Sequence, residues 1–315
     1  MPRILITGGA GFIGQAVIRT FRQVYPESSL RAMDLVKAPG DDIERYTGSI
    51  LDANDINRAV QDCDYVVHLA AMLGVKRTEA QRLECLTVNI QGTLNVLDAC
   101  VKNRVKKIVF SSSSEIYGEP FENPIREVTP ASPKSVYAVT KLAGEEYLRA
   151  YRERYGLRFS VVRFFNVYGP GQVAEFVMPR FIKAVMEDKP PVVYGAGNQI
   201  RAFCYVDDAA AGVVRALLND KADGEAFNIG NDLEPVSMRE LAGRVITLLG
   251  KPMKPVLVEM SQSDRSAGRE IHERFPDISK ARRVLAYEPT VSLDEGVRRT
   301  AAAGPIEASW YDPMT

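Results

Sequence analysis

A glycine-rich turn near the start of the chain constrains the fold most. Residues 7–14 read TGGAGFIG; they follow the apolar run Arg3–Thr7 and open the helical pattern Phe12–Val24. Glycines permit the tight turn and let backbone N–H groups approach a pyrophosphate, while the helix N-terminus adds partial positive charge. Asp34 ends the next apolar run, where a carboxylate accepts hydrogen bonds from a ribose and repels a 2′-phosphate. The segment predicts a dinucleotide site that prefers NAD to NADP; the alternative is a purely structural turn.

Short apolar runs alternate with helical patterns through the first half of the chain. Runs such as Tyr65–Val67 and Ile108–Phe110 are apolar throughout, which is typical of parallel strands buried on both faces. Strands that alternate with helices favour an α/β chain with a doubly wound, Rossmann-type parallel sheet. We expect strands at Arg3–Thr7, Leu30–Asp34, Asp64–Ala70, Lys107–Ser112 and Arg158–Phe164, and helices at Phe12–Val24, Asp55–Gln61, Leu86–Asn103 and Val136–Tyr155.

Proline and glycine punctuate the chain after Asn166, and the apolar pieces become shorter. This change predicts a smaller, mostly C-terminal α/β lobe. We expect residues 1–166 and 196–226 to form the dinucleotide-binding domain, and residues 167–195 and 227–315 to form the smaller lobe. A length of 315 residues suits one large domain with a smaller partner.

The composition argues against several other classes of protein. The 40 basic residues balance 40 acidic ones, so the chain lacks the net positive charge that is typical of proteins that bind nucleic acid or an anionic membrane. It shows neither a signal-peptide pattern at the N-terminus nor an apolar run long enough to span a membrane. With only two histidines, no metal site is expected. Separated cysteines without a CxxC pair favour reduced thiols in a cytoplasmic protein: Cys63, Cys85, Cys100 and Cys204.

Tyr137 and Lys141 are the candidate catalytic pair. At positions i and i+4 they share one face of the predicted helix Val136–Tyr155. A nearby ammonium is expected to lower the pKa of the phenol, which could then take a hydroxyl proton. The serine-rich residues 111–114 follow a predicted strand, at the edge of the sheet where ligands bind. The alternatives are an ordinary exposed helix face and a serine loop that caps itself.

Together these segments resemble the extended short-chain dehydrogenase/reductase superfamily, in its NAD-dependent epimerase/dehydratase branch. The resemblance covers nearly the whole chain and its order is highly specific. The matching segments are the TGGAGFIG loop, Asp34, His68–Ala71, Asn89, Ser111–Gly118, Tyr137 with Lys141, Arg163–Gly171, Arg201–Asp208 and Pro276–Arg282.

The resemblance implies a role for each matching residue. Tyr137 is expected to be the base, Lys141 to hold the nicotinamide ribose and tune the tyrosine, and Ser113 to be the catalytic serine. The expected NAD-binding residues are Gly8, Gly11, Phe12, Ile13, Gly14, Asp34, Ile50, Asp52, Leu69, Ala70, Ala71, Asn89, Tyr137 and Lys141. The expected residues for a nucleotide-diphosphate sugar are Ser113, Ser114, Asn166, Arg201 and, on a looser alignment, Arg265.

Some of these roles have structural alternatives. Asp52 could reach the adenine amine or cap a helix, and these two roles are equally compatible with its spacing. Asn166 could stabilise a turn, and Arg201 could be a surface ion-pair partner. The segments Met72–Arg82 and Gln172–Phe176 are expected to shape the sugar pocket.

The residues around Glu115 leave three reactions open. We favour a UDP-sugar 4-epimerase that acts through a transient 4-keto sugar and needs only serine, tyrosine and NAD. Glu115 resembles the glutamate of 4,6-dehydratases and glucuronate decarboxylases, which act at C5, although Ser114 stands where dehydratases carry Asp. Glu115 could instead accept an N–H in its own turn. A catalytically silent NAD sensor is the third hypothesis, against which the intact Ser113, Tyr137 and Lys141 argue.

The assembly is also predicted by resemblance. The helices Leu86–Asn103 and Val136–Tyr155 carry apolar stripes that, in similar proteins, pair across a two-fold axis as a four-helix bundle. We expect a homodimer; the alternative is that these stripes pack on their own sheet.

Overall fold

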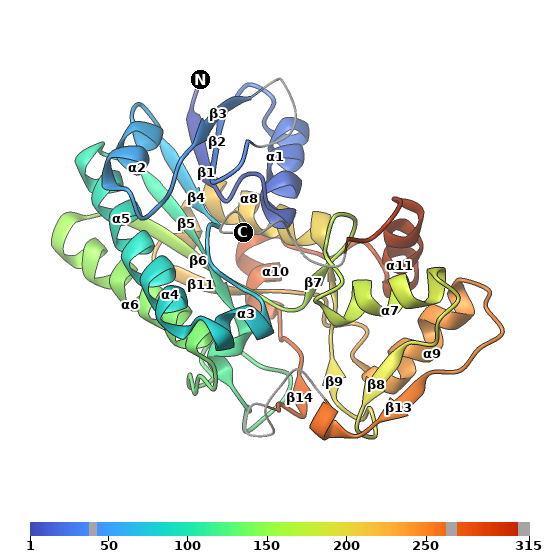
Figure 1. Cartoon of the computed structure of the whole chain (residues 1–315). Coiled ribbons are helices and arrows are strands. Elements are labelled where there is room, and N and C mark those ends of the chain that lie inside the picture. Colours follow the sequence, from blue (N-terminus) through green and yellow to red (C-terminus); the bar gives the residue numbers. More distant parts are fainter. Residues whose placement is uncertain (38–42, 263–269, 308–315) are drawn as a thin grey trace.

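The computed structural model describes residues 1–37, 43–262 and 270–307. Within these residues, seven parallel strands form a central sheet in the order β11-β6-β5-β4-β1-β2-β3 (Figure 1). The strands are β1 Arg3–Thr7, β2 Ser29–Asp34, β3 Glu44–Thr47, β4 Tyr65–His68, β5 Lys107–Ser113, β6 Arg158–Phe164 and β11 Glu225–Ile229. The predicted doubly wound parallel sheet is confirmed.

Helices cover both faces of this sheet because successive side chains of each strand point to opposite sides. In β1, Ile4 and Ile6 enter one hydrophobic cluster and Leu5 enters the other. Helices α1 Phe12–Val24 and α8 Val206–Leu218 pack on the first face. The helices of the second face are α2 Ala53–Val60, α5 Gly92–Lys102 and α6 Val136–Tyr155.

A smaller part of the chain lies beyond the carboxyl ends of the large sheet (Figure 1). Its short strands form the sheets β10-β7, β12-β9-β14 and β13-β8 among the described residues. These strands are β7 Val167–Tyr168, β8 Val192–Tyr194, β9 Ile200–Arg201, β10 Cys204–Tyr205, β12 Val236–Ser237, β13 Val256–Val258 and β14 Glu273–Arg274. Its helices are α7 Val177–Met186, α9 Met238–Leu248 and α11 Leu293–Ala302, whereas α10 Ser279–Leu285 packs against β11 and α8 of the larger part. The predicted smaller α/β lobe is therefore present.

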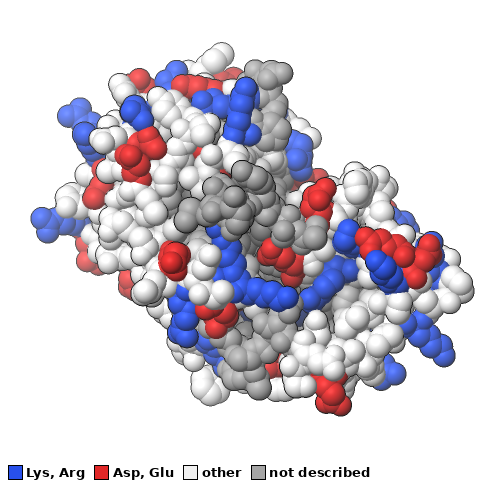
Figure 2. All heavy atoms as spheres, viewed as in Figure 1, with Lys and Arg blue, Asp and Glu red and all other residues white. Residues whose placement is uncertain are grey.

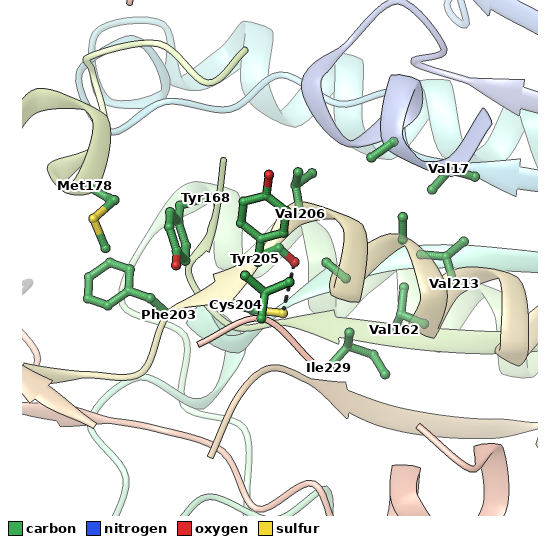
Figure 3. Close-up of a cluster of buried hydrophobic side chains, with 14 of the residues drawn as sticks. Val17, Val162, Tyr168, Met178, Phe203, Cys204, Tyr205, Val206, Val213 and Ile229 are labelled. Atoms are coloured by element: carbon green, nitrogen blue, oxygen red, sulfur yellow. Dashed lines mark hydrogen bonds between the residues drawn. The ribbon is translucent and has the colours of Figure 1, made fainter. Parts of the chain in front are cut away.

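One hydrophobic cluster continues from the large sheet into the smaller part (Figure 3). It joins Val17 of α1 and Val213 of α8 to Tyr168 and Phe203. The rings of Tyr168 and Phe203 meet edge to face, with centroids 6.1 Å apart, an arrangement that aromatic pairs favour. The two parts therefore share one core.

Several elements differ from the sequence expectation. The strands β3 and β11 were not predicted, and the expected domain boundary at residue 226 falls within β11. The expected helix Leu86–Asn103 is instead a series of α4 Arg82–Leu86, a π-helical turn at Thr87–Gln91 and α5; the short helix α3 Val75–Ala80 comes before it. The division into two binding domains stays a prediction.

Candidate active site

The glycine loop lies where the order of the large sheet reverses, between β1 and β4. Ligands bind outside the carboxyl ends of the strands at such a point. An added Cβ would lie 2.8 Å from the Ala70 nitrogen at Gly8, and 2.2 Å from the Gly8 oxygen at Gly14. Within the described residues, no side chain caps the start of α1, so its first N–H groups are left for an anion. This close-packed, uncapped turn fits a dinucleotide pyrophosphate.

Asp34, at the end of β2, reaches back to this loop. Its carboxylate accepts the N–H of Ala10 at 2.9 Å and that of Leu35 at 2.8 Å. Burial raises the pKa of Asp34, and these backbone hydrogen bonds oppose that shift. The carboxylate therefore lies beside the turn, where a ribose contact is predicted.

Asp52, predicted to reach the adenine or to cap a helix, and Ile50, predicted to bind NAD, have structural roles. Asp52 is the N-cap of α2 and accepts the N–H groups of Asn54 and Asp55 at 2.7 and 3.2 Å. Ile50 packs against the start of α5, so closely that a Cβ on Gly92 would lie 2.4 Å from its Cδ1. The capping role of Asp52 is therefore shown, while contact with adenine stays a prediction.

Asn89 braces the segment that follows β4. It lies in the π-helical turn and is 4% exposed. Its side chain accepts the N–H of Met72 at 2.7 Å, donates to the Met72 oxygen at 3.0 Å, and donates to the Thr140 hydroxyl at 3.1 Å. Asn89 thus ties Leu69–Ala71, the predicted cofactor-lining residues, to helix α6.

His68 forms a buried chain of hydrogen bonds that sequence reasoning missed. Its Nδ1 lies 2.7 Å from the Thr7 hydroxyl, and its Nε2 lies 3.1 Å from the Thr93 hydroxyl. Because Thr93 donates to the Asn89 oxygen at 2.6 Å, we assign the proton of the ring to Nε2. Burial, with the nearby Lys141 charge, lowers the pKa of His68 to about 3. A neutral imidazole therefore links the glycine loop to α5.

Tyr137 and Lys141 lie on the face of α6 that packs against β5. The Lys141 nitrogen is 5.6 Å from the centroid of the Tyr137 ring, 5.0 Å from that of Phe110, and 3.4 Å from the Ser111 hydroxyl. Tyr137 packs against the cluster of Met72, Cys85 and Val136, of which Met72 lies in the segment beyond the carboxyl end of β4. The pair therefore lies at the edge of the sheet that also carries the glycine loop.

The expectation that Lys141 lowers the pKa of Tyr137 is wrong for the protein without bound NAD or sugar. Burial and the charge of Glu115 raise the pKa of Tyr137 above its usual value. Burial also lowers the pKa of Lys141 to about 7, so the ammonium is only partly populated at neutral pH. Loss of solvent outweighs the ammonium–phenol attraction that the spacing suggested.

The segment after β5 brings Glu115 close to Tyr137. Ser113 caps the 3-10 turn Ser114–Tyr117 by accepting the Glu115 N–H at 3.1 Å, which is the self-capping alternative. The backbone oxygen of Glu115 accepts the Gly118 N–H at 3.2 Å within the turn. Its carboxylate instead reaches α6, where Oε2 accepts the hydroxyl of Ser135 at 3.0 Å. Ser135 is the N-cap of α6, two residues before Tyr137. Ser114 is 2% exposed.

Asn166 and Arg201 belong to a polar cluster at the base of the smaller part. Asn166 has a left-handed backbone with φ of 40° and donates to the Ala202 oxygen at 2.8 Å, so its turn-stabilising role is shown. Arg201 is buried and donates to the oxygens of Ile271 and His272, at 2.6 and 3.2 Å. It is therefore not at the surface, although its Nη2 lies 4.0 Å from the carboxylate of Glu270, which is also largely buried.

Arg274 is a residue of this cluster that sequence reasoning missed. It pairs in register with Arg201 across β14 and β9, and it donates to the Asn166 oxygen at 3.1 Å. Its position just before the matching segment Pro276–Arg282 could have drawn attention to it. Arg265, which was also expected to bind the nucleotide-diphosphate sugar, lies outside the described residues.

Loops of the smaller part approach the glycine loop. A Cβ on Gly171 would lie 4.0 Å from Phe12, and one on Gly74 would lie 3.1 Å from the Glu175 carboxylate. The two segments expected to shape the sugar pocket therefore meet at Gly74 and Glu175. Figure 2 shows Lys and Arg side chains crossing the middle of this face, where a polyanionic ligand would find cations.

Two absences bear on the chemistry. The part of the chain that the structure describes contains no group of histidine, cysteine and carboxylate side chains able to hold a metal. None of its helices has both the length and the apolarity needed to cross a membrane.

Comparison with known proteins decides the family. The model of the NAD dependent epimerase/dehydratase family matches residues 4–230. The chain belongs to this family. It is therefore an NAD-dependent, sugar-modifying enzyme, and its cofactor is NAD.

Relatives within the epimerase/dehydratase family differ in the reaction they are named for. The chain is 36% identical to a UDP-N-acetyl-alpha-D-glucosaminuronate decarboxylase of Bacillus cytotoxicus, over 95% of this chain and 96% of that protein. It is 37% identical to a UDP-glucuronate 4-epimerase of Thermodesulfobacterium geofontis, over 75% and 70%. The crystal structure of a UDP-glucose 4-epimerase of Thermotoga maritima with UDP-glucose has a TM-score of 0.88, at 30% identity, with 96% and 98% covered.

Proposed function

We propose that this enzyme is a UDP-sugar 4-epimerase. The observation that carries the proposal is the meeting of Tyr137, Lys141 and the serine segment at the carboxyl end of β5, beside the glycine loop. A 4-epimerase needs no acid at position 114, and the buried Ser114 supplies none. The similarity to a 4-epimerase over nearly the whole chain supports the same reaction.

In the proposed reaction, Tyr137 accepts the proton of the sugar 4-hydroxyl while Ser113 holds that oxygen by a hydrogen bond. NAD, held by the glycine loop, Asp34 and Lys141, would supply reversible hydride transfer at C4 and a positive charge that favours the phenolate. Tyr137 returns the proton to O4 when the alcohol is re-formed with the opposite configuration at C4. Product and substrate therefore have the same mass.

We also propose where the two ligands lie. The glycine loop, Asp34 and Lys141 hold NAD in the part formed by residues 1–166 and 196–226. The part formed by residues 167–195 and 227–315 holds the nucleotide sugar, together with Arg201 of strand β9, which lies outside those ranges. Arg201 and Arg274 are in register on adjacent strands next to Asn166, and guanidinium groups suit a diphosphate.

A panel of UDP-glucose, UDP-N-acetylglucosamine and UDP-glucuronate tests the reaction. We expect one of them to give a product of unchanged mass that is inverted at C4, read by mass spectrometry and NMR. Tyr137→Phe should lose at least about a hundredfold in kcat while NAD remains bound. Release of CO2 or water from any of these sugars would reject the epimerase in favour of a lyase.

A lyase that uses Glu115 is the second candidate. The Glu115 carboxylate lies close enough to Tyr137 to raise its pKa, and its hydrogen bond to Ser135 fixes it at the start of α6. The 36% identical decarboxylase supports C5 chemistry. Under this candidate, Glu115→Gln abolishes turnover and spares NAD and nucleotide-sugar binding, whereas the exposed Glu122→Gln changes neither. Unchanged turnover by Glu115→Gln would reject the lyase.

We further propose a cytoplasmic homodimer that pairs through the helices around α5 and α6. Leu83 and Val139 are 76% and 44% exposed beside these helices, and the four cysteines are free, buried thiols. Light scattering should give twice the chain mass, and Leu83→Glu should give a monomer. Leu233→Glu, a change at a site 66% exposed in the smaller part, should leave the mass unchanged. A monomeric wild type would contradict the dimer.

A further inference from the structure

A buried ion pair lies two helical turns beyond the tyrosine on α6. Glu145 is fully buried, and its carboxylate accepts the Nε and Nη2 groups of Arg163 at 3.0 and 2.6 Å. It also accepts the hydroxyl of Ser112 at 2.6 Å. A bidentate pair of this kind is geometrically specific, because both oxygens and two nitrogens must align.

The pair is anchored to three strands of the large sheet. From β6, Arg163 donates through Nη1 to the Tyr117 hydroxyl at 2.7 Å and to the Glu127 oxygen at 2.9 Å. Tyr117 in turn donates to Asn228 of β11 at 2.7 Å. With Ser112 on β5, this network fixes Glu145, and so the whole helix, against the sheet.

The network lies on the same stripe of α6 as the catalytic pair. Tyr137, Lys141 and Glu145 follow one another at intervals of four residues, which places them on one helix face. The helix lies close to the sheet next to Glu145, where a Cβ on Gly144 would lie 2.4 Å from the Phe110 ring. We propose that Glu145 and Arg163 are positioning residues, which set Tyr137 and Lys141 at the end of β5 and keep the Glu145 carboxylate away from Lys141.

The pairing of Glu145 with Arg163 affects Lys141, because a glutamate and a lysine four residues apart on a helix ordinarily attract each other. Arg163 instead engages both oxygens of Glu145, and Lys141 contacts the Ser111 hydroxyl and the rings of Phe110 and Tyr137. Among the residues that the structure describes, Lys141 is thereby left buried without a carboxylate partner, which agrees with its pKa of about 7.

The other titratable groups around Lys141 come from two further elements and from α6 itself. They are His68 of β4, Cys85 of α4 and Tyr137 of α6, while Glu115 acts on Tyr137. His68 has a pKa of about 3 and the pKa of Cys85 is raised by burial, so neither changes charge near pH 7. The charges of His68 and Cys85 therefore stay constant over the pH range in which the titration of Lys141 is measured.

Matched arginine variants of the holoenzyme test the proposal. Arg163→Met removes the buried partner of Glu145, whereas Arg149→Met removes an exposed arginine 3.8 Å from the same carboxylate. The titration of Lys141 is followed by the 13Cε shift in lysine-labelled protein, with Lys141→Met for assignment. We expect Arg163→Met to raise the midpoint by about one pH unit or more and to lower kcat about tenfold or more, with NAD retained. Arg149→Met should change neither.

An unchanged Lys141 midpoint in folded, NAD-loaded Arg163→Met would overturn the proposal. If that variant does not fold, Arg163→Lys keeps the charge, loses the bidentate geometry and is judged by the same midpoint. Glu145→Gln removes the carboxylate, so the midpoint should not rise there. The inference rests on the proposed roles of Tyr137 and Lys141, but the midpoint is measured without substrate. Failure of the sugar panel is therefore distinguishable from failure of this proposal.

Discussion

Two buried lysines stand at opposite ends of β5 and differ in what surrounds them. Lys107 donates to the Ala216 and Asn219 oxygens, at 2.6 and 2.9 Å, and so completes the end of α8. Burial lowers the pKa of Lys107 to about 8 and that of Lys141 to about 7. Lys141 has fewer polar contacts and lies at the ligand edge, so its charge is the one that a bound molecule can change.

Replacing Lys141 should therefore change how stability depends on pH. An unfolded lysine titrates near 10.5, whereas Lys141 titrates near 7 in the fold. Between these values unfolding takes up a proton, so the unfolding free energy of the wild type rises with pH. Lys141→Met removes this buried charge; its gain over the wild type, at about 1.4 kcal/mol per pKa unit, should be greatest below pH 7 and vanish above pH 10.5. Urea unfolding across pH measures this.

The exposed Lys102→Met is the matched control and should show no such pH-dependent difference. A Lys141→Met gain that stays constant from pH 6 to 10 would contradict the assigned titration.

Single residues of the site were predictable where spacing alone carries the chemistry. The i, i+4 pair Tyr137/Lys141 needs only a helix, and Asp34 needs only the strand after the glycine loop. The direction of the Tyr137 pKa was not predictable, because it depends on burial that only the packed structure sets. Arg274 and Arg201 were not linked either, since their pairing joins segments more than 70 residues apart.

At the scale of elements, the β1–α1 turn depends on the absence of side chains. Gly14→Ala would place a Cβ 2.2 Å from the Gly8 oxygen, so either the turn or the helix must shift. We expect this variant to lose NAD, measured by the absorbance of released cofactor, because the N–H groups of the turn no longer converge.

Gly243→Ala in α9 is the control, because the added Cβ meets nothing within 4 Å, and it should stabilise the protein by roughly 0.5–1 kcal/mol. Full NAD occupancy in Gly14→Ala would contradict this account.

Elements with strong signals were predicted to the residue, and weak ones were missed. Helix α6 and strand β6 have the bounds expected from sequence. Strand β3, with the sequence ERYT, lacks an apolar run because it lies at the edge of the sheet. The π-helical turn has no local signal, and there Asn89 reaches Met72 across the chain.

At the scale of the whole molecule, the shared hydrophobic cluster predicts one cooperative unfolding step. Phe203 is 6% exposed and lies in the cluster that joins both parts. Phe203→Ala should lower the unfolding free energy by about 3–5 kcal/mol and leave a single calorimetric transition. Phe121→Ala, at a residue 95% exposed, should have little effect. Two resolved transitions in either protein would show that the parts unfold independently.

The same continuity sets a rule for building chimeras. A substrate lobe transplanted from a relative would have to fit Phe12 of α1 and Val206 of α8 in the recipient, which lie beside Gly171 and Gly169 of the lobe. A chimera that exchanges only the lobe, joined where the chain passes between the two parts, would leave side chains in this hydrophobic cluster that do not fit each other. Engineers who wish to exchange sugar specificity should therefore move the buried facing residues of α1 and α8 together with the lobe.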